Sequence, residues 1–260
     1  MIRNGVIDMA VTVRNLSIGE GVPKICVPIV GRTEEEILSE ARSIAEEEPD
    51  IIEWRVDFYE SVTELEKVKA LAGRIRRIID DIVFLFTFRS VKEGGASVVP
   101  VYYYDRMNRE IAMDRNVDCI DVELFTDGID LKNFVNGLKE TGVKIVISSH
   151  DFFKTPLASE LSCRLYKMRE IGADILKIAV MPETAADVLM LLKVTNDWKE
   201  KNGNQPVITM AMSPKGVISR LTGELFGSAV TFASAGKASA PGQLPIDQMR
   251  AFLDFFHENN

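Results

Sequence analysis

The sequence predicts a parallel α/β fold of the (β/α)₈ barrel class. Short apolar runs alternate with longer amphipathic segments along the whole chain, and most of these runs recur at intervals of about 25 to 35 residues, as in βαβ units. The apolar runs lack the polar alternation of a half-exposed sheet, which favours a parallel sheet that is covered on both faces. The length of 260 residues also fits, because such barrels need about 250 residues.

The eight predicted strands are runs of aliphatic and aromatic residues bounded by glycine, proline or charged residues. They are Lys24–Val30, Ile51–Asp57, Ile82–Phe88, Cys119–Leu124, Val143–Ser148, Asp174–Val180, Val207–Met212 and Ala229–Phe232. Helices are predicted at 34–47, 63–79, 102–115, 130–141, 157–171, 184–201, 215–226 and 246–257. Thr33 stands before three glutamates as a helix N-cap, and Gly142 and Gly172 follow two of these helices as glycines that end them.

The segment before the first strand, about residues 1–20, is predicted to be a β-hairpin. Met9–Ile18 alternates partly in polarity and turns near Arg14 and Asn15. We expect this hairpin to close the bottom of the barrel, at the amino-terminal ends of the strands, so that residues 1–260 form a single barrel domain. A doubly wound open sheet is the structural alternative. The absence of a Gly-x-Gly-x-x-Gly turn after the first strand argues against a nucleotide-binding version of it.

Composition excludes several classes of partner. The net charge of -8 and the pI near 5.0 argue against a nucleic-acid or anionic membrane surface. No apolar stretch approaches the ~20 residues that span a bilayer, and charged residues interrupt the first twenty positions, unlike a signal peptide. Cys26, Cys119 and Cys163 are far apart and include no Cys-x-x-Cys pair, which indicates reduced thiols rather than a zinc site. We expect a cytoplasmic protein.

Lys177 is the most informative residue, because it interrupts an otherwise apolar predicted strand. Removing an ammonium from water is costly, so burial favours the neutral amine. A neutral amine attacks carbonyl carbon and forms a Schiff base. The structural alternative is a lysine that is paired with a buried carboxylate or that reaches the surface.

Charged side chains gather near the carboxyl ends of the predicted strands, where the active sites of such barrels lie. The set comprises Glu53, Arg55, Arg89, Asp121, Glu123, His150 and Lys177. Glu53 and Arg55 are two residues apart and so share one face of their strand, where a salt bridge between them is the structural alternative. Burying an unpaired ion costs several kcal/mol, so these charges need partners. The set therefore indicates either an ion-pair network or a polar ligand.

Two further features contribute to the predicted site. His150 ends an apolar run and is the candidate for proton transfer near neutral pH, with a hydrogen bond to a loop carbonyl as its structural alternative. The neighbouring lysine and arginines argue against a divalent metal there. The segment 237–245 is rich in small residues and proline, which is usual for a surface loop. Over a barrel mouth it would act as a lid that brings Ser239 and Gln243 onto a substrate.

Nearly the whole chain, from Lys24 to the terminal helix, resembles the type I 3-dehydroquinate dehydratases. The segments that carry the resemblance are Glu53-Trp54-Arg55-Val56-Asp57, Thr87-Phe88-Arg89 with Glu93-Gly94-Gly95, Ser149-His150-Asp151-Phe152 with Thr155-Pro156, Lys177-Ile178-Ala179, Gly216-Val217-Ile218-Ser219-Arg220-Leu221 with Gly227-Ser228, and Ala238-Ser239-Ala240-Pro241-Gly242-Gln243.

The resemblance implies a TIM barrel, commonly a homodimer, that converts 3-dehydroquinate to 3-dehydroshikimate and water without a metal or cofactor. It implies that Lys177 forms the Schiff base, that His150 transfers protons and that Glu93 orients this histidine. The substrate-binding residues that it implies are Glu53, Arg55, Arg89, Arg220, Ser239 and Gln243.

The chemistry of these side chains supports such roles. An iminium on Lys177 is an electron sink that acidifies the adjacent C2 proton, which His150 can remove. The same imidazole then protonates the C1 hydroxyl as it leaves, so one base on one face predicts syn elimination. Arg220 is the arginine that we expect to bind the substrate carboxylate through two hydrogen bonds.

The sequence is also compatible with two rival functions. A class I aldolase on the same barrel also uses a lysine on a strand, but aldolases that act on sugar phosphates need glycine amides near the last two strands as a phosphate site. The sequence offers Arg220, Ser239 and Gln243 there instead. A barrel that binds a ligand without catalysis would form no adduct on Lys177.

Overall fold

The computed structural model describes residues 10–202, 205–235 and 242–259, which form a parallel barrel surrounded by helices. Eight strands lie in the order β10-β3-β4-β5-β6-β7-β8-β9, and each pairs in parallel with the next. The amide of Ala229, just before β10, donates to the carbonyl of Val207 in β9 over 2.8 Å, so the two ends of the sheet meet. The predicted (β/α)₈ barrel is confirmed.

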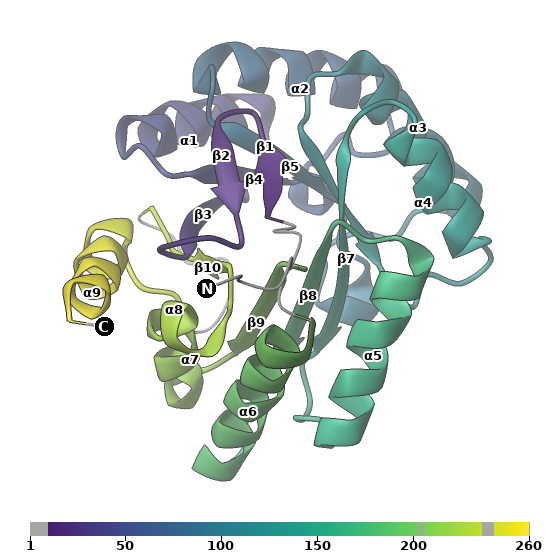
Figure 1. Cartoon of the computed structure of the whole chain (residues 1–260). Helices are drawn as coiled ribbons and strands as arrows, with labels where there is room; N and C mark the ends of the chain where they lie inside the picture. Colours follow the sequence, from purple (N-terminus) through teal and green to yellow (C-terminus); the bar gives the residue numbers. More distant parts are fainter. Residues whose placement is uncertain (1–9, 203–204, 236–241, 260) are drawn as a thin grey trace, which may run out of the picture.

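The strands of the barrel are β3 (Lys24–Ile29), β4 (Ile51–Arg55), β5 (Val83–Thr87), β6 (Cys119–Glu123), β7 (Lys144–Asp151), β8 (Ile175–Val180), β9 (Val207–Ala211) and β10 (Val230–Phe232). The helices are α1 (Glu34–Glu46), α2 (Leu65–Ile79), α3 (Val101–Asp114), α4 (Leu131–Lys139), α5 (Ala158–Ile171), α6 (Ala185–Asn202), α7 (Val217–Leu221), α8 (Gly223–Phe226) and α9 (Ile246–Glu258). Figure 1 shows α1 to α6 around the outside of the strands.

Local chemistry explains where several helices begin and end. The Thr33 side chain accepts from the amide of Glu36 while the Glu36 side chain accepts from the amide of Thr33, which is a capping box at the start of α1. Gly172 ends α5 with a φ of 107°, a left-handed conformation that glycine adopts without steric cost. The caps predicted at these two positions are confirmed.

The predicted hairpin is also present, as β1 (Val11–Val13) and β2 (Leu16–Ile18), which pair antiparallel around a turn at Arg14 and Asn15. Its Val13 and Ile18 pack in the barrel interior against residues from the amino-terminal halves of the strands, among them Cys26, Ile51, Val83, Cys119, Val146 and Ile175. Arg14 binds Asp118, immediately before β6, over 2.7 Å. The hairpin therefore covers the bottom of the barrel, opposite the carboxyl ends (Figure 1).

Three predicted elements differ from the structure. The strand expected at Ile51–Asp57 ends at Arg55, where the chain enters a 3₁₀ segment. The strand expected to end at Ser148 continues to Asp151, because residues 149–151 pair with residues 178–180 of β8. The helix expected at 215–226 is divided into a short 3₁₀ turn at 214–216, α7 and α8. It breaks at Thr222, whose φ of -102° and ψ of 24° are not helical and whose hydroxyl donates to the carbonyl of Ile218 over 2.7 Å.

The apolar core has two layers. The larger lies between the outer face of the strands and the helices, and it includes Trp54, Phe84, Phe86 and Phe134. The smaller fills the barrel from the hairpin upward. It leaves the carboxyl ends of the strands to polar side chains, so the packing itself places the site at that end. Among the described residues, no helix has the length and apolarity needed to cross a membrane.

Candidate active site

A cavity opens at the carboxyl ends of the barrel strands. It has about 580 Å³ of empty volume, which includes space open to solvent. Its lining residues are Glu53, Arg55, Arg89, Glu93, Gly94, His150, Phe152, Lys177, Ala179, Met210, Met212, Arg220, Phe232 and Gln243. Eight of the nine residues predicted for the site are in this list; the ninth, Ser239, lies outside the described residues.

Lys177 lies in the middle of β8 and is only 4% exposed, yet its amine reaches the cavity. Its Nζ donates to Oδ2 of Asp121 over 3.4 Å and lies 3.6 Å from Oε1 of Glu53. It also lies 4.4 Å from the centre of the Phe232 ring, whose π face attracts a cation. The buried carboxylates compensate an ammonium at this position, so the amine is both paired with acids and directed into the cavity.

Arg89, just after β5, forms ion pairs with three buried acids. One of its Nη atoms lies 2.9 Å from Asp121 and the other lies 3.1 Å from Glu123 and 3.6 Å from Glu93. Burial works against the charge on this guanidinium, but Asp121, Glu123 and Glu93 outweigh it and raise the pKa of Arg89. Arg89 is therefore a permanent cation with a fixed orientation.

Glu53 and Arg55 do not form a salt bridge with each other, so the structural alternative given for this pair in the sequence analysis is wrong. Glu53 accepts from the hydroxyl of Thr87 over 2.8 Å and faces Lys177. Arg55 is the last residue of β4, and it binds both carboxylate oxygens of Asp57 at 2.8 Å. The chain turns into a 3₁₀ segment at 56–58, which brings Asp57 under the guanidinium.

His150 and Glu93 form an acid–imidazole pair. Oε2 of Glu93 lies 2.9 Å from Nδ1 of His150 and accepts from the His150 amide over 3.0 Å. Burial, together with Arg89, Lys177 and Arg55, lowers the pKa of His150 well below its usual value. Burial raises the pKa of Glu93 to about 8, and the acids Glu123 and Asp121 add to this while Arg89 opposes it. At neutral pH the imidazole is a neutral base held by a carboxyl group.

Arg220 and Gln243 reach the cavity from elements beyond β9. Arg220 lies on α7, is 2% exposed and contacts Sδ of Met210 over 3.7 Å. Burial lowers the pKa of Arg220 to about 10, so it remains a cation at neutral pH. Gln243 follows the segment 236–241, on which Ser239 falls and of which the structure gives no description.

Three acids organise the site from behind the lining residues: Asp121 and Glu123, which the sequence placed among the strand-end charges without a role of their own, and Asp57, which it gave no separate role. Each is at most 6% exposed, and together they bind Arg55, Arg89 and Lys177. The sequence placed Asp121 and Glu123 at a strand end, but spacing alone does not show which cation each one meets. Phe232, the aromatic ring beside Lys177, had no signal in the sequence beyond its apolar strand.

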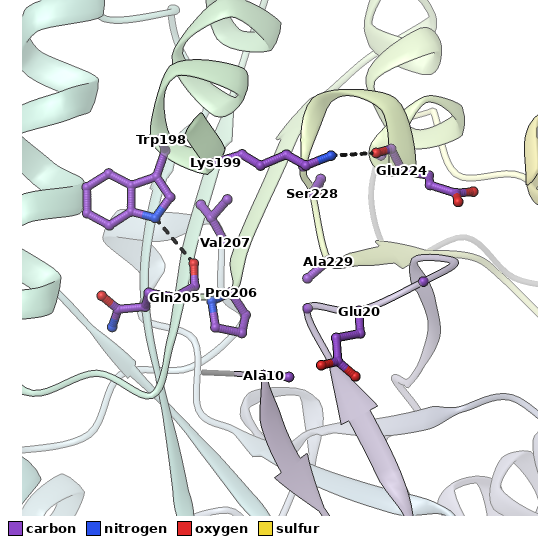
Figure 2. A pocket seen from close by; sticks show the side chains of 14 residues that line it. Ala10, Glu20, Trp198, Lys199, Gln205, Pro206, Val207, Glu224, Ser228 and Ala229 are labelled. Carbon is purple, nitrogen blue, oxygen red and sulfur yellow. Dashed lines mark hydrogen bonds between the residues drawn. The ribbon is translucent and has the colours of Figure 1, made fainter. Parts of the chain in front are cut away.

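A second hollow lies at the opposite end of the barrel, between the hairpin, α6 and α8 (Figure 2). Its two large donors are already engaged: Trp198 donates to the carbonyl of Gln205 over 3.3 Å and Lys199 donates to the carbonyl of Glu224 over 3.1 Å. Within residues 10–202, 205–235 and 242–259, no group of three or more His, Cys, Asp or Glu is arranged to hold a metal ion.

A barrel with a buried amine, an imidazole and three arginines around one cavity belongs to the class of (β/α)₈ enzymes that act on small anionic carbonyl compounds. A family model described as type I 3-dehydroquinase matches residues 25–260. The chain belongs to the type I 3-dehydroquinate dehydratase family, and the following similarities agree with this.

The chain is 49% identical over 249 residues to a 3-dehydroquinate dehydratase of Clostridium botulinum, which covers 96% of this chain and 98% of the relative. It is also 49% identical over 248 residues to one of Listeria monocytogenes, covering 95% and 98%.

Among solved structures, a type I 3-dehydroquinate dehydratase of Clostridium difficile with covalent modified comenic acid superposes with a TM-score of 0.94 at 47% identity, covering 98% of this chain and 100% of that one. The 3-dehydroquinate dehydratase of Geobacillus kaustophilus gives 0.93 at 39% identity and covers 96% of each chain.

Proposed function

We propose that this enzyme dehydrates 3-dehydroquinate to 3-dehydroshikimate by syn elimination through a Schiff base on Lys177. The observation that carries the proposal is the Lys177 amine, buried yet lining the cavity, with His150 on the neighbouring strand. Ser148 is the β-sheet partner of Lys177, so His150 lies on the same face, one step nearer the carboxyl ends. The amine and the base therefore face one bound molecule.

Imine formation comes first. The ammonium of Lys177 gives a proton to the neutral His150, and the free amine then bonds to the ketone carbon of the substrate. A proton passes from nitrogen to oxygen, and the imidazolium protonates the hydroxyl so that water leaves. The product is an iminium with one positive charge on nitrogen, and His150 is neutral again.

Elimination uses the same imidazole. The iminium withdraws electrons, so His150 can remove the C2 proton and leave an enamine. The enamine expels the C1 hydroxyl, which receives the proton from His150 and departs as water, and hydrolysis of the imine releases the product and restores Lys177. Because Glu93 holds Nδ1, the other ring nitrogen is the one that faces the substrate.

The remaining cations would bind and orient the substrate. Arg220 is the buried arginine suited to the carboxylate, because two parallel N–H donors match a carboxylate in geometry. Glu53, Arg55 and Arg89 would hold the ring hydroxyls, with Gln243 and Ser239 closing over them. Buried acids fix Arg55 and Arg89, so these binding groups are positioned before the substrate arrives.

We further propose that the enzyme is a cytoplasmic homodimer. The family resemblance supports the dimer, and the three cysteines, which are free thiols, fit a reducing compartment.

Activity measurements on two variants test the mechanism. Formation of the conjugated enone product is followed by its absorbance. Lys177→Ala removes the nucleophile and should abolish turnover. His150→Ala keeps the nucleophile but removes the proton carrier, so turnover should fall about 10²–10⁴-fold. A histidine variant that turns over like the wild type would show that another group transfers the protons.

A further inference from the structure

Asp121, on β6, lies between the two cations at the centre of the site. It is 0% exposed, and its Oδ2 lies 3.4 Å from Nζ of Lys177 and 2.9 Å from the guanidinium of Arg89. Its other oxygen, Oδ1, accepts from the hydroxyl of Ser148 over 2.6 Å, and that hydroxyl also accepts from Arg89 over 2.8 Å. Both carboxylate oxygens are therefore held in one orientation.

Asp121 does not line the cavity, so it would act on the substrate only through its neighbours. Burial works against its ionisation, but Arg89 and Lys177 outweigh this and lower the pKa of Asp121, with help from the Ser148 hydrogen bond. The carboxylate is thus a fixed negative charge directed at the amine that bonds to the substrate.

We propose that Asp121 is a positioning residue for the Schiff base: it holds the Lys177 nitrogen at the cavity floor and balances its positive charge in the ammonium and in the iminium. This inference rests on the proposed function. In that mechanism the nitrogen carries one positive charge before imine formation and one after it, whereas the attacking amine is neutral. A charge fixed at 3.4 Å favours the two cationic states over the neutral one.

Among the residues that the structure describes, the other groups around Lys177 do not duplicate this role. Arg89 is a cation and His150 is neutral, so neither can balance a positive charge on Lys177. The Cys26 thiol from β3 is buried and neutral, and the Phe232 ring offers only its π face. Glu53 is the second acid, at 3.6 Å, but it also lines the cavity, where it would meet the substrate. Asp121 is the acid whose contacts are with the cations and with Ser148.

The test compares Asp121→Asn with the wild type and with Asp118→Asn. Asp118 immediately precedes β6 and binds Arg14 and Arg76 at the other end of the barrel, so the control removes a carboxylate beside the same strand but far from the amine. Each protein is mixed with 3-dehydroquinate across a range of pH and reduced with borohydride. The mass of the peptide that contains Lys177 gives the fraction trapped, and kcat and KM are measured alongside.

With Asp121→Asn, we expect the trapped fraction to fall at least about tenfold near neutral pH, because the Lys177 nitrogen is no longer held at the cavity floor facing the substrate. The acid limb of the trapping profile should move to lower pH by about one unit or more. KM should stay within about threefold while kcat falls, and Asp118→Asn should keep the wild-type profile. A wild-type trapping profile and kcat in Asp121→Asn would overturn the inference.

Two further measurements keep the outcomes distinct. If Asp121→Asn does not fold, as judged by circular dichroism, Ser148→Ala replaces it: this variant keeps the charge but frees Oδ1, so kcat should fall about threefold or more with an unshifted acid limb. A wild-type kcat in Ser148→Ala would then overturn the inference. If the wild type itself gives no adduct on Lys177, the proposed function fails, and not the role of Asp121 alone.

Discussion

At the scale of single residues, the site is a set of buried cations paired with buried carboxylates, and Lys177 is one member of this set. The sequence drew attention to Lys177 because it interrupts an apolar strand. The structure shows that its surroundings are as acidic as they are apolar, with Glu53 and Asp121 both within 3.6 Å. The cost of burying this amine is therefore met by two carboxylates, and its reactivity depends on a neighbouring base that can remove a proton.

Glu93 gives the first prediction at this scale. Because its pKa is raised to about 8, this carboxyl group is largely protonated at pH 7, where glutamine is a close replacement. Glu93→Gln should therefore keep kcat within about tenfold of the wild type at pH 7. Above pH 8, Glu93 of the wild type gains a negative charge next to His150, so the kcat of the wild type should change with pH. The kcat of Glu93→Gln should not show this change.

Profiles of kcat against pH for the two proteins provide the measurement. A fall of more than about a thousandfold in Glu93→Gln at pH 7 would mean that an ionised carboxylate is required at neutral pH, contrary to the protonation state inferred here.

At the scale of elements, the strand ends and the turns that follow them decide which side chains meet. The apolar runs were enough to predict all eight barrel strands, because each one is buried on both faces. They were not enough to predict partners. Arg55 turns to Asp57 because β4 ends there and the chain enters a 3₁₀ segment, and the end of an apolar run does not encode that turn.

The division of the predicted 215–226 helix has a similar cause. A Cβ at Gly216 would lie 2.0 Å from the carbonyl oxygen of Ala211, so the chain must pass close to the end of β9 before α7 can start. This close approach brings Arg220 into the cavity. It depends on a contact between distant segments, which helical periodicity in the sequence does not report.

Asp57 provides the prediction at this scale, since it joins β4 to the loop that carries Glu93. Its carboxylate binds Arg55 at 2.8 Å and accepts from the amides of Arg89 and Ala96 at 3.3 and 3.0 Å. In Asp57→Asn one acceptor becomes a donor that faces a guanidinium. We expect KM to rise about tenfold or more with a smaller change in kcat, and a loss of stability of about 3 kcal/mol, since a buried ion pair loses one charge.

Steady-state kinetics and urea unfolding measure these two effects. The matched control is Asp130→Asn, at the exposed N-cap of α4, where asparagine caps as well as aspartate does and neither quantity should change. An unchanged KM in Asp57→Asn would show that Arg55 does not depend on this partner for substrate binding.

At the scale of the whole molecule, the apolar packing and the charged site lie at opposite ends of the barrel. The hairpin and the amino-terminal ends of the strands form a closed apolar end, while the charges collect at the other end. The sequence could predict this division, because the hairpin, the apolar runs and the strand-end charges are all local patterns. Ser239 is different, because local patterns alone do not test its role. The family resemblance in the sequence predicts that Ser239 binds the substrate, and Ser239 falls on the segment 236–241 that the structure does not describe.

The charges at the site should also make stability depend on pH. The folded protein holds a proton on Glu93 up to about pH 8, whereas an unfolded glutamate, with an ordinary value of 4.5, has already released it. Stability should therefore fall as the pH rises toward 8, by up to about 1.4 kcal/mol per pH unit from this group. Below about pH 6.5 the lowered pKa of His150 acts in the opposite sense, because the unfolded chain binds the proton first.

The window from pH 6.5 to 8 thus isolates Glu93. Urea unfolding of the wild type and Glu93→Gln at several pH values in this window measures the difference. The wild type should lose stability relative to the variant as the pH rises, and parallel curves for the two proteins would argue against a raised pKa at Glu93.

The central claim, that the amine of Lys177 bonds covalently to the substrate, has one most direct test. The wild-type protein is mixed with 3-dehydroquinate, reduced with borohydride and digested, and the peptide that contains Lys177 is weighed by mass spectrometry. We expect a reduced adduct on Lys177 in the wild type and none in Lys177→Ala. An active wild-type enzyme that yields no adduct, or an adduct on a different lysine, would contradict the account.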